Sequence, residues 1–155
     1  MNTDVVTGAP ERSPVAKRPR GRRWPWILLR VTLCVLAVDV LTQAVLAGRF
    51  LSGDFASLTG HEINGSKIAS SISFVVIAVA IVAWRAGGGP GWLVPVTVVL
   101  SGAIVTQIVL GFSHVLGVHI PLGVTIIGLT GWLAVWVCTH QPSDRPFARR
   151  SGARS

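Results

Sequence analysis

Residues 92–138 read WLVPVTVVLSGAIVTQIVLGFSHVLGVHIPLGVTIIGLTGWLAVWVC, a long apolar segment that is the strongest indication of the fold. No Asp, Glu, Lys or Arg occurs between residues 86 and 143. An apolar helix needs about 20 residues to cross the hydrocarbon core of a bilayer. The stretch is long enough for two such helices, and the turn between Gly111 and Gly117 divides it. It therefore predicts membrane-spanning helices over residues 92–112 and 118–138.

Two further apolar segments precede this stretch. The chain is 50% hydrophobic and only 13% charged, whereas about a quarter of a soluble domain is charged. Because a membrane span must satisfy its backbone hydrogen bonds internally, these segments are expected to be helices. We predict an all-α integral membrane protein, a four-transmembrane-helix bundle in one domain. Its expected parts are a disordered basic arm (1–23), a bundle domain (24–140, with helices at about 26–48, 63–84, 92–112 and 118–138) and a basic tail (141–155).

Basic residues predict the orientation of the bundle. They are concentrated in the arm, in the tail and at Arg85 in the second connection, and the positive-inside rule places these regions in the cytoplasm. Five tryptophans fall at the same helix ends, as an interfacial aromatic belt would: Trp24, Trp26, Trp84, Trp92 and Trp136. We therefore predict a multi-pass protein of the plasma (inner) membrane with both termini cytoplasmic. On this interpretation the net charge of +8 serves topology rather than nucleic-acid binding.

The two halves of the chain resemble each other. The first predicted helix ends in LTQAVLA (41–47) and the third in VTQIVLG (105–111), and each is followed by a histidine with glycine four residues later. This pattern predicts two parallel helical-hairpin repeats. The shared residues are Gln43, His61 and Gly65 in the first half and Gln107, His119 and Gly123 in the second.

A repeat of this kind would set His61 and His119 facing each other across the bundle. Each is expected to open its helix, with Pro121 in the first turn of the fourth, where the positive end of the helix dipole favours neutral imidazole, the metal-ligating form. A glycine at i+4 lies on the same helix face and leaves room for a flat ligand. Histidines on facing helices are the general arrangement for an axially ligated haem in a bundle. The alternative is that both are ordinary interfacial polar residues.

Residues 25–138 resemble one four-helix half of haem A synthase, and also a family of small uncharacterised bacterial four-helix membrane proteins with paired histidines. The matching residues are Gln43, Ala47-Gly48, His61 and His119-Ile-Pro. The resemblance implies a b-type haem between helices 2 and 4, as in b-type cytochrome bundles. The synthase has a glutamate shortly before its second-helix histidine, whereas Glu62 follows His61 here. That difference, and the presence of one half only, argue against the synthase reaction.

Other polar residues have several possible roles. Asp39 lies in the middle of the first span, so its carboxylate should face the bundle interior, either hydrogen-bonded to Gln107, Thr106 or Ser101 or serving a proton relay. Arg49 and Lys67 could pair with haem propionates or extend towards head groups. The remaining residues of interest have simpler predicted roles: His114 solvated in a turn, His140 interfacial, and Cys34 and Cys138 buried free thiols.

Three functions remain open at this point. The first is a haem protein that moves electrons at the outer leaflet, with a redox partner or within a larger membrane complex. The second is a non-catalytic membrane scaffold or accessory subunit of such a complex. The third, and the weakest, is a small carrier that uses Asp39 and Gln107. No nucleophile–base pair or phosphate loop is evident, so the chain is not expected to be an independent enzyme.

Overall fold

The computed structural model describes residues 23–140, and the predicted basic arm and tail lie outside these residues apart from residue 23. The described chain is helical, with no strand between residues 23 and 140. Its elements are α1 (Trp24–Leu51), α2 (Ala56–Ile63), the π-helix η1 (Asn64–Ala69), α3 (Ser70–Gly87), α4 (Leu93–Phe112) and α5 (Leu116–Thr139). Because α2, η1 and α3 follow one another without a break, they form one long helix.

Four helices are therefore long and apolar enough to span a membrane: Trp24–Leu51, Ala56–Gly87, Leu93–Phe112 and Leu116–Thr139. Many of their large apolar side chains are exposed on the outer surface of the bundle, including Val38, Val99 and Val135. In water such a surface would be unfavourable, but in a bilayer lipid covers it. The all-α, four-helix prediction is confirmed, and the molecule has the architecture of a multi-pass membrane protein.

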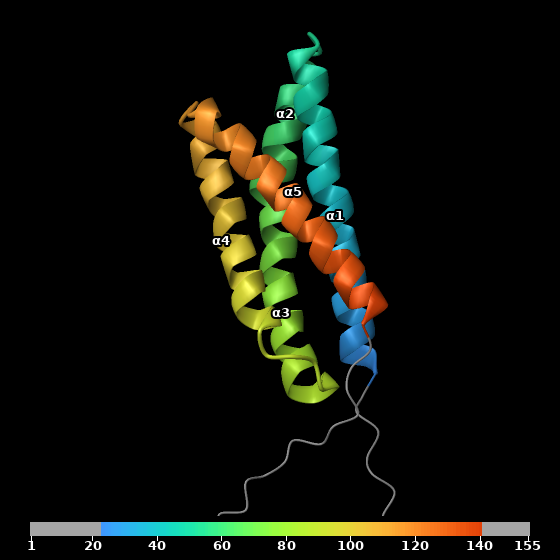
Figure 1. The fold of residues 1–155 in the computed structure, drawn as a ribbon. Coiled ribbons are helices and arrows are strands. Elements are labelled where there is room, and N and C mark those ends of the chain that lie inside the picture. Colours follow the sequence, from blue (N-terminus) through green and yellow to red (C-terminus); the bar gives the residue numbers. More distant parts are fainter. Residues whose placement is uncertain (1–22, 141–155) are drawn as a thin grey trace, which may run out of the picture.

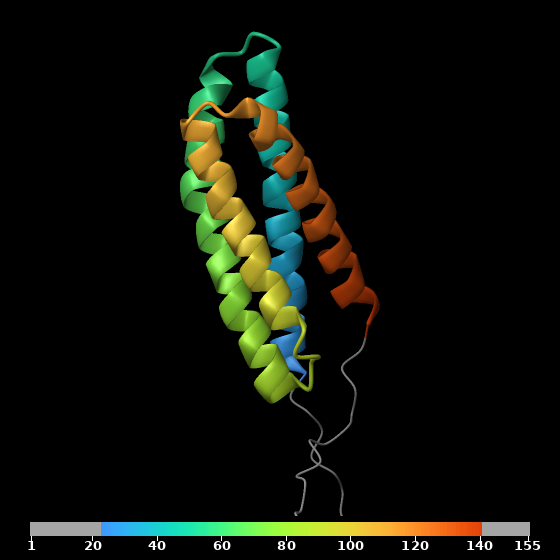
Figure 2. The same ribbon diagram turned by 60° about the vertical axis from the view of Figure 1, so that its left-hand side comes forward.

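The helices form a closed bundle in which each packs on two neighbours. Helix α1 packs on α3 and α5, and α4 packs on the same two helices. Figures 1 and 2 show that α1 and α2 extend beyond the turn between α4 and α5, and that α5 crosses the bundle obliquely. Residues 23 and 140, the two ends of the described chain, lie at the same end of the bundle.

The core changes character along the bundle axis. Towards the end that holds both termini it is apolar, with fully buried Leu29, Leu33, Ala83 and Val137. An aromatic cluster lies at the same end, where the ring of Trp136 is 4.7 Å from that of Trp92. The middle holds small hydroxyl residues, and beyond them the buried side chains include a carboxylate and an amide. The polar part of the interior therefore lies in the half of the bundle away from the termini.

The second span differs most from its predicted bounds. Its helix begins at Ala56 rather than near residue 63, because the chain reverses direction within a short turn in which Gly53 adopts a φ of 99°. That left-handed conformation costs glycine little. As a result His61 does not open its helix but lies inside it, so the helix-dipole argument does not apply to this residue. His119 lies in the first turn of α5, as expected, whereas Pro121 is further inside the helix than predicted.

Candidate functional site

The structure brings His61 of α2 and His119 of α5 together across the bundle. Their ring centroids are 6.2 Å apart, and the ring planes are inclined by 65°. Both imidazoles are partly buried. With a rise of 1.5 Å per residue, His119 lies about 30 Å along α5 from Thr139, close to the thickness of a hydrocarbon core. The pair therefore lies near one boundary of the predicted spans, at the end opposite the termini.

Each imidazole is held by the main chain of the neighbouring helix. His61 Nδ1 lies 3.2 Å from the carbonyl oxygen of Gln43, and His119 Nδ1 lies 2.9 Å from that of Gln107. A carbonyl oxygen can only accept a hydrogen bond, so Nδ1 must carry the proton and donate it. In the neutral imidazole this leaves Nε2 with its lone pair. Nδ1–H donation to a main-chain carbonyl is the usual way in which proteins orient a histidine that ligates a metal.

The same two glutamines also meet the glycines that follow the histidines. A Cβ at Gly65 would collide with Nε2 of Gln43, and a Cβ at Gly123 would lie 2.9 Å from Nε2 of Gln107. Glycine is therefore needed at both positions so that a carboxamide can lie against the facing helix. The room that was expected for a flat ligand is taken up by these carboxamides in the structure.

Three oxygen atoms at this level are buried and have no hydrogen-bond partner in the described part of the chain: Asp39 Oδ2, Gln43 Oε1 and Gln107 Oε1. Leaving a buried acceptor unpaired costs about 1–3 kcal/mol. Buried polar atoms normally find partners, so such a group calls for a bound water, ion or ligand as its explanation. The two glutamine oxygens belong to residues that hold the histidines, which makes this polar region part of the site.

Asp39 lies beside Asn64, a residue that the sequence pattern does not identify. Asn64, the first residue of the π-helix, is buried, and its Nδ2 donates a 3.5 Å hydrogen bond to the main-chain oxygen of Asp39. A π-helical turn is rare and is often found at functional sites. Two of the three expected partners of Asp39 bond elsewhere: Ser101 Oγ donates to the carbonyl oxygen of Ser73, and Thr106 Oγ1 to that of Gly102.

We expect Asp39→Leu to stabilise the bundle, because it removes a buried oxygen that has no partner. The free energy of unfolding should rise by about 1–3 kcal/mol, measured by thermal unfolding in detergent. Thr42→Leu, on the exposed side of the same helix, should change it little. A lower free energy of unfolding in Asp39→Leu would contradict this prediction and would mean that the carboxyl group contributes to helix packing.

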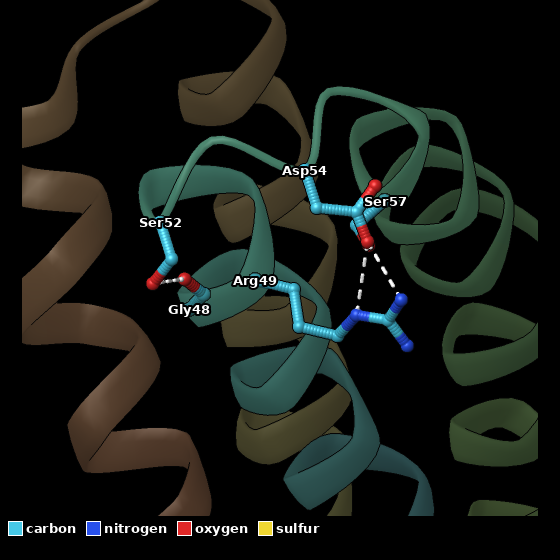
Figure 3. Close-up of polar contacts among 5 residues, drawn as sticks. All are labelled: Gly48, Arg49, Ser52, Asp54 and Ser57. Carbon is cyan, nitrogen blue, oxygen red and sulfur yellow. Dashed lines mark hydrogen bonds and ion pairs between the residues drawn. The ribbon is translucent and has the colours of Figure 1, made fainter.

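Arg49 is already paired in the structure. Figure 3 shows its side chain bonded to Asp54 in the connection between α1 and α2, with Nε and Nη2 donating to Oδ2 at 3.0 and 2.6 Å. The hydroxyl of Ser57 donates to the same oxygen at 2.8 Å. These bonds, first that from Ser57 and then that from Arg49, hold the pKa of the Asp54 carboxyl below its usual value. Lys67 is exposed on η1 and makes no ion pair within residues 23–140.

The connection between α1 and α2 should loosen in acid. A carboxyl whose pKa is lowered by folding adds stability that is present above its unfolded pKa of about 3.9. This stability is lost as the pH falls through the lower, folded value. We expect the protection of the amides of residues 52–57, measured as exchange relative to the intrinsic rate at each pH, to fall below about pH 4 in the wild type. In Asp54→Asn this protection should be low at every pH. Equal exchange in the two proteins at neutral pH would contradict a stabilising role for the Arg49–Asp54 pair.

The other two histidines lie outside the site. His114 is exposed in the turn between α4 and α5, with a left-handed φ of 58°. His140 follows the last turn of α5, where its ring stacks on Trp136 with centroids 4.2 Å apart. One histidine therefore lies beyond the site in a turn and the other at the far end of the bundle, which matches the roles expected of them.

Arg30 of α1 bonds to the end of α5, a contact that the sequence pattern does not predict. Its Nε donates to the carbonyl oxygen of Val137 at 2.8 Å, and its Nη2 to that of His140 at 2.9 Å. The indole of Trp26 donates a third bond to His140, at 3.1 Å. The last carbonyls of a helix have no partner within the helix, so side chains of α1 here supply the partners for α5.

Cys34 and Cys138 depart from their predicted role as buried thiols. Both are exposed on the surface of the bundle, and their Sγ atoms lie 3.8 Å apart. The two residues come from α1 and α5, the first and last helices of the described chain.

The chemistry that the histidine pair can support follows from its donor set. No group of three or more His, Cys, Asp or Glu side chains within residues 23–140 could hold a metal ion. A tetrahedral site made only of protein ligands is therefore not formed by these residues. Two imidazoles are the donor set of a metal that brings its other ligands with it, as haem iron does.

No protein-family model, curated protein or solved structure matches the chain, so the fold and the site are interpreted from their own geometry.

Proposed function

We propose that this protein binds a b-type haem between His61 and His119 and moves electrons near the outer leaflet of the plasma membrane. The observation that carries the proposal is the paired arrangement of the imidazoles, each held at Nδ1 by a main-chain carbonyl and separated by 6.2 Å between centroids. Bound haem would supply one-electron redox chemistry. The chain's own residues would supply the ligands and their orientation, and the carboxamides of Gln43 and Gln107 would have to move aside to admit the porphyrin.

The separation of the rings supports a shared metal. Metal–nitrogen bonds to histidine are about 2.0–2.1 Å long, so nitrogens on opposite sides of one ion lie about 4 Å apart, and the ring centroids about 6 Å apart. The observed separation of 6.2 Å is in this range. An inclination of 65° between the rings is compatible with axial ligation, because each ring can turn about its own metal–nitrogen bond.

The matching contacts in the two halves support two parallel helical-hairpin repeats. Each half pairs a histidine with the carbonyl of a glutamine on the preceding spanning helix, and each lays that glutamine's carboxamide against the glycine four residues after the histidine. Two equivalent hairpins would present two equivalent ligands to one central group. In this proposal the positive-inside rule places both termini in the cytoplasm, so the histidine pair faces the outer leaflet.

Two basic residues near the histidine pair are candidates to bind the haem propionates. Lys67 is exposed on the π-helix that follows His61 and is available for a carboxylate. Arg49 could contribute only by giving up or sharing its bond to Asp54. We therefore assign propionate binding to Lys67 before Arg49.

Titration of the detergent-purified protein with haemin tests the proposal. We expect saturation at one haem per chain, with a Soret band that sharpens and shifts as both imidazoles bind. A linear, unsaturable rise in absorbance, equal to that seen with detergent micelles alone, would contradict the proposal. It would leave the non-catalytic scaffold or accessory subunit as the better account of this bundle.

A further inference from the structure

The two cysteines form a contact that the haem proposal does not use. The chain has only two cysteines, and their Sγ atoms are 3.8 Å apart although 104 positions separate them in the sequence. A disulfide has an S–S bond of about 2.0 Å. The sulfur atoms must therefore approach by about 1.8 Å to form the bond.

Neighbouring contacts hold the two thiols beside each other. Cys34 follows Arg30 by one helical turn on the same face of α1. The guanidinium of Arg30 bonds to the carbonyls of Val137 and His140, which flank Cys138 in α5. The juxtaposition of the sulfur atoms is thus part of the packing of α1 on α5 and does not depend on a loop.

The surroundings of the pair decide what kind of reagent reaches it. Both thiols are exposed, and the exposed neighbours Val31, Val35 and Val135 make this surface apolar. In a bilayer such a surface faces lipid, so an oxidant dissolved in the membrane has direct access to the pair. The oxidant must also accept two electrons and two protons, because that is what two thiols release when they join.

We propose that Cys34 and Cys138 are a reversible dithiol–disulfide site that a lipid-soluble quinone oxidises. One thiol loses its proton and adds through sulfur to a carbonyl carbon of the quinone; the sulfur of the second thiol then attacks the first sulfur, so that the carbon–sulfur bond breaks, the S–S bond forms and the ring leaves as a quinol. The two S–H bonds are lost, and the quinone gains two electrons and two protons to become a quinol. The disulfide then links α1 to α5 covalently. In the proposed topology this end of the bundle faces the cytoplasm, where thiol pools reduce such a bond again.

The test uses the full chain, reduced and reconstituted without oxygen in phosphatidylcholine–phosphatidylglycerol vesicles. A benzoquinone with a fully substituted ring is added, since such a ring has no free carbon at which a thiol can add permanently. Free thiols are counted with a maleimide and the intact mass is measured. We expect monomeric protein to lose both thiols, with one quinol formed per chain, and dithiothreitol to restore them. Because the chain has no other cysteine, an intramolecular disulfide can only join Cys34 to Cys138.

Three variants serve as controls. Cys34→Ser and Cys138→Ser should each keep their remaining thiol and produce no quinol. The double variant Cys34→Ser/Val35→Cys moves the thiol one position along α1, so that it points in a different direction from the helix axis. Its loss of thiols should be at least tenfold slower than that of the wild type. Thiols that stay titratable with quinone present would overturn the proposal, as would oxidation only by a water-soluble reagent such as diamide, or disulfides only between chains. None of these outcomes depends on haem.

Discussion

His119→Ala is expected to abolish the spectrum of six-coordinate, low-spin haem. With one imidazole removed, a single histidine of the pair would remain to hold the haem. We expect haem retained after purification to fall at least tenfold, which corresponds to about 1.4 kcal/mol or more of lost binding free energy. His61→Ala should have the same effect, because the two imidazoles are held in the same way. The measurement is the visible spectrum per mole of folded protein.

His114→Ala is the matched control for these variants. His114 lies in the exposed turn that precedes α5, five residues before His119, and does not belong to the pair. Its removal should leave the haem content and the band positions unchanged. A wild-type spectrum in both His61→Ala and His119→Ala would contradict the assignment of these residues as ligands, whatever the haem content of the protein.

Arg30→Met is expected to cause the largest loss of stability. The variant keeps a long side chain but removes two hydrogen bonds from a charged donor to the last carbonyls of α5. Hydrogen bonds to charged groups contribute about 1.5–3 kcal/mol each, although the carbonyl oxygen of His140 keeps its bond from the indole of Trp26. We expect the free energy of unfolding to fall by about 2–4 kcal/mol, measured by denaturation in mixed detergent micelles.

Arg85→Met controls for the loss of a positive charge at the same end of the bundle. Arg85 is exposed, and its guanidinium lies 4.4 Å from the ring centroid of Trp84, one residue before it in the chain. Arg85→Met should therefore lower the free energy of unfolding much less than Arg30→Met does. Equal effects of the two substitutions would mean that charge, and not the bonds to α5, accounts for the loss.

The sequence predicted the helices well because a membrane span has a simple physical signature. The ranges 92–112 and 118–138 agree with α4 and α5 to within two residues, since length and apolarity decide where such a helix lies. The second span was harder. Its outer part contains His61, Glu62 and Asn64, polar residues that lower the hydropathy although the helix continues through them.

The site could be predicted only in part. The repeated Gln, His and Gly pattern pointed to the histidine pair, and the structure brings these residues together. The pattern could not show that the glutamines bind the histidines through their main chains, because spacing carries no information on which atoms meet. The π-helix that places Asn64 beside Asp39 has no sequence signal of its own.

Contacts between distant segments were the least predictable. Arg30 lies inside the first predicted span, and its bonds to α5 cross 107 and 110 positions of the sequence. Cys34 and Cys138 show the same limit, since two isolated cysteines give no pairing pattern. Both contacts depend on how α1 and α5 are packed, which hydropathy does not specify.

A reduced-minus-oxidised visible spectrum of the protein, purified in mild detergent from cells supplied with haem, is the most direct test of haem binding. We expect the sharp α and Soret bands of a low-spin haem with two imidazole ligands, at one haem per chain. A well-folded, colourless protein would contradict it, and the facing histidines would then have to be explained by helix packing alone.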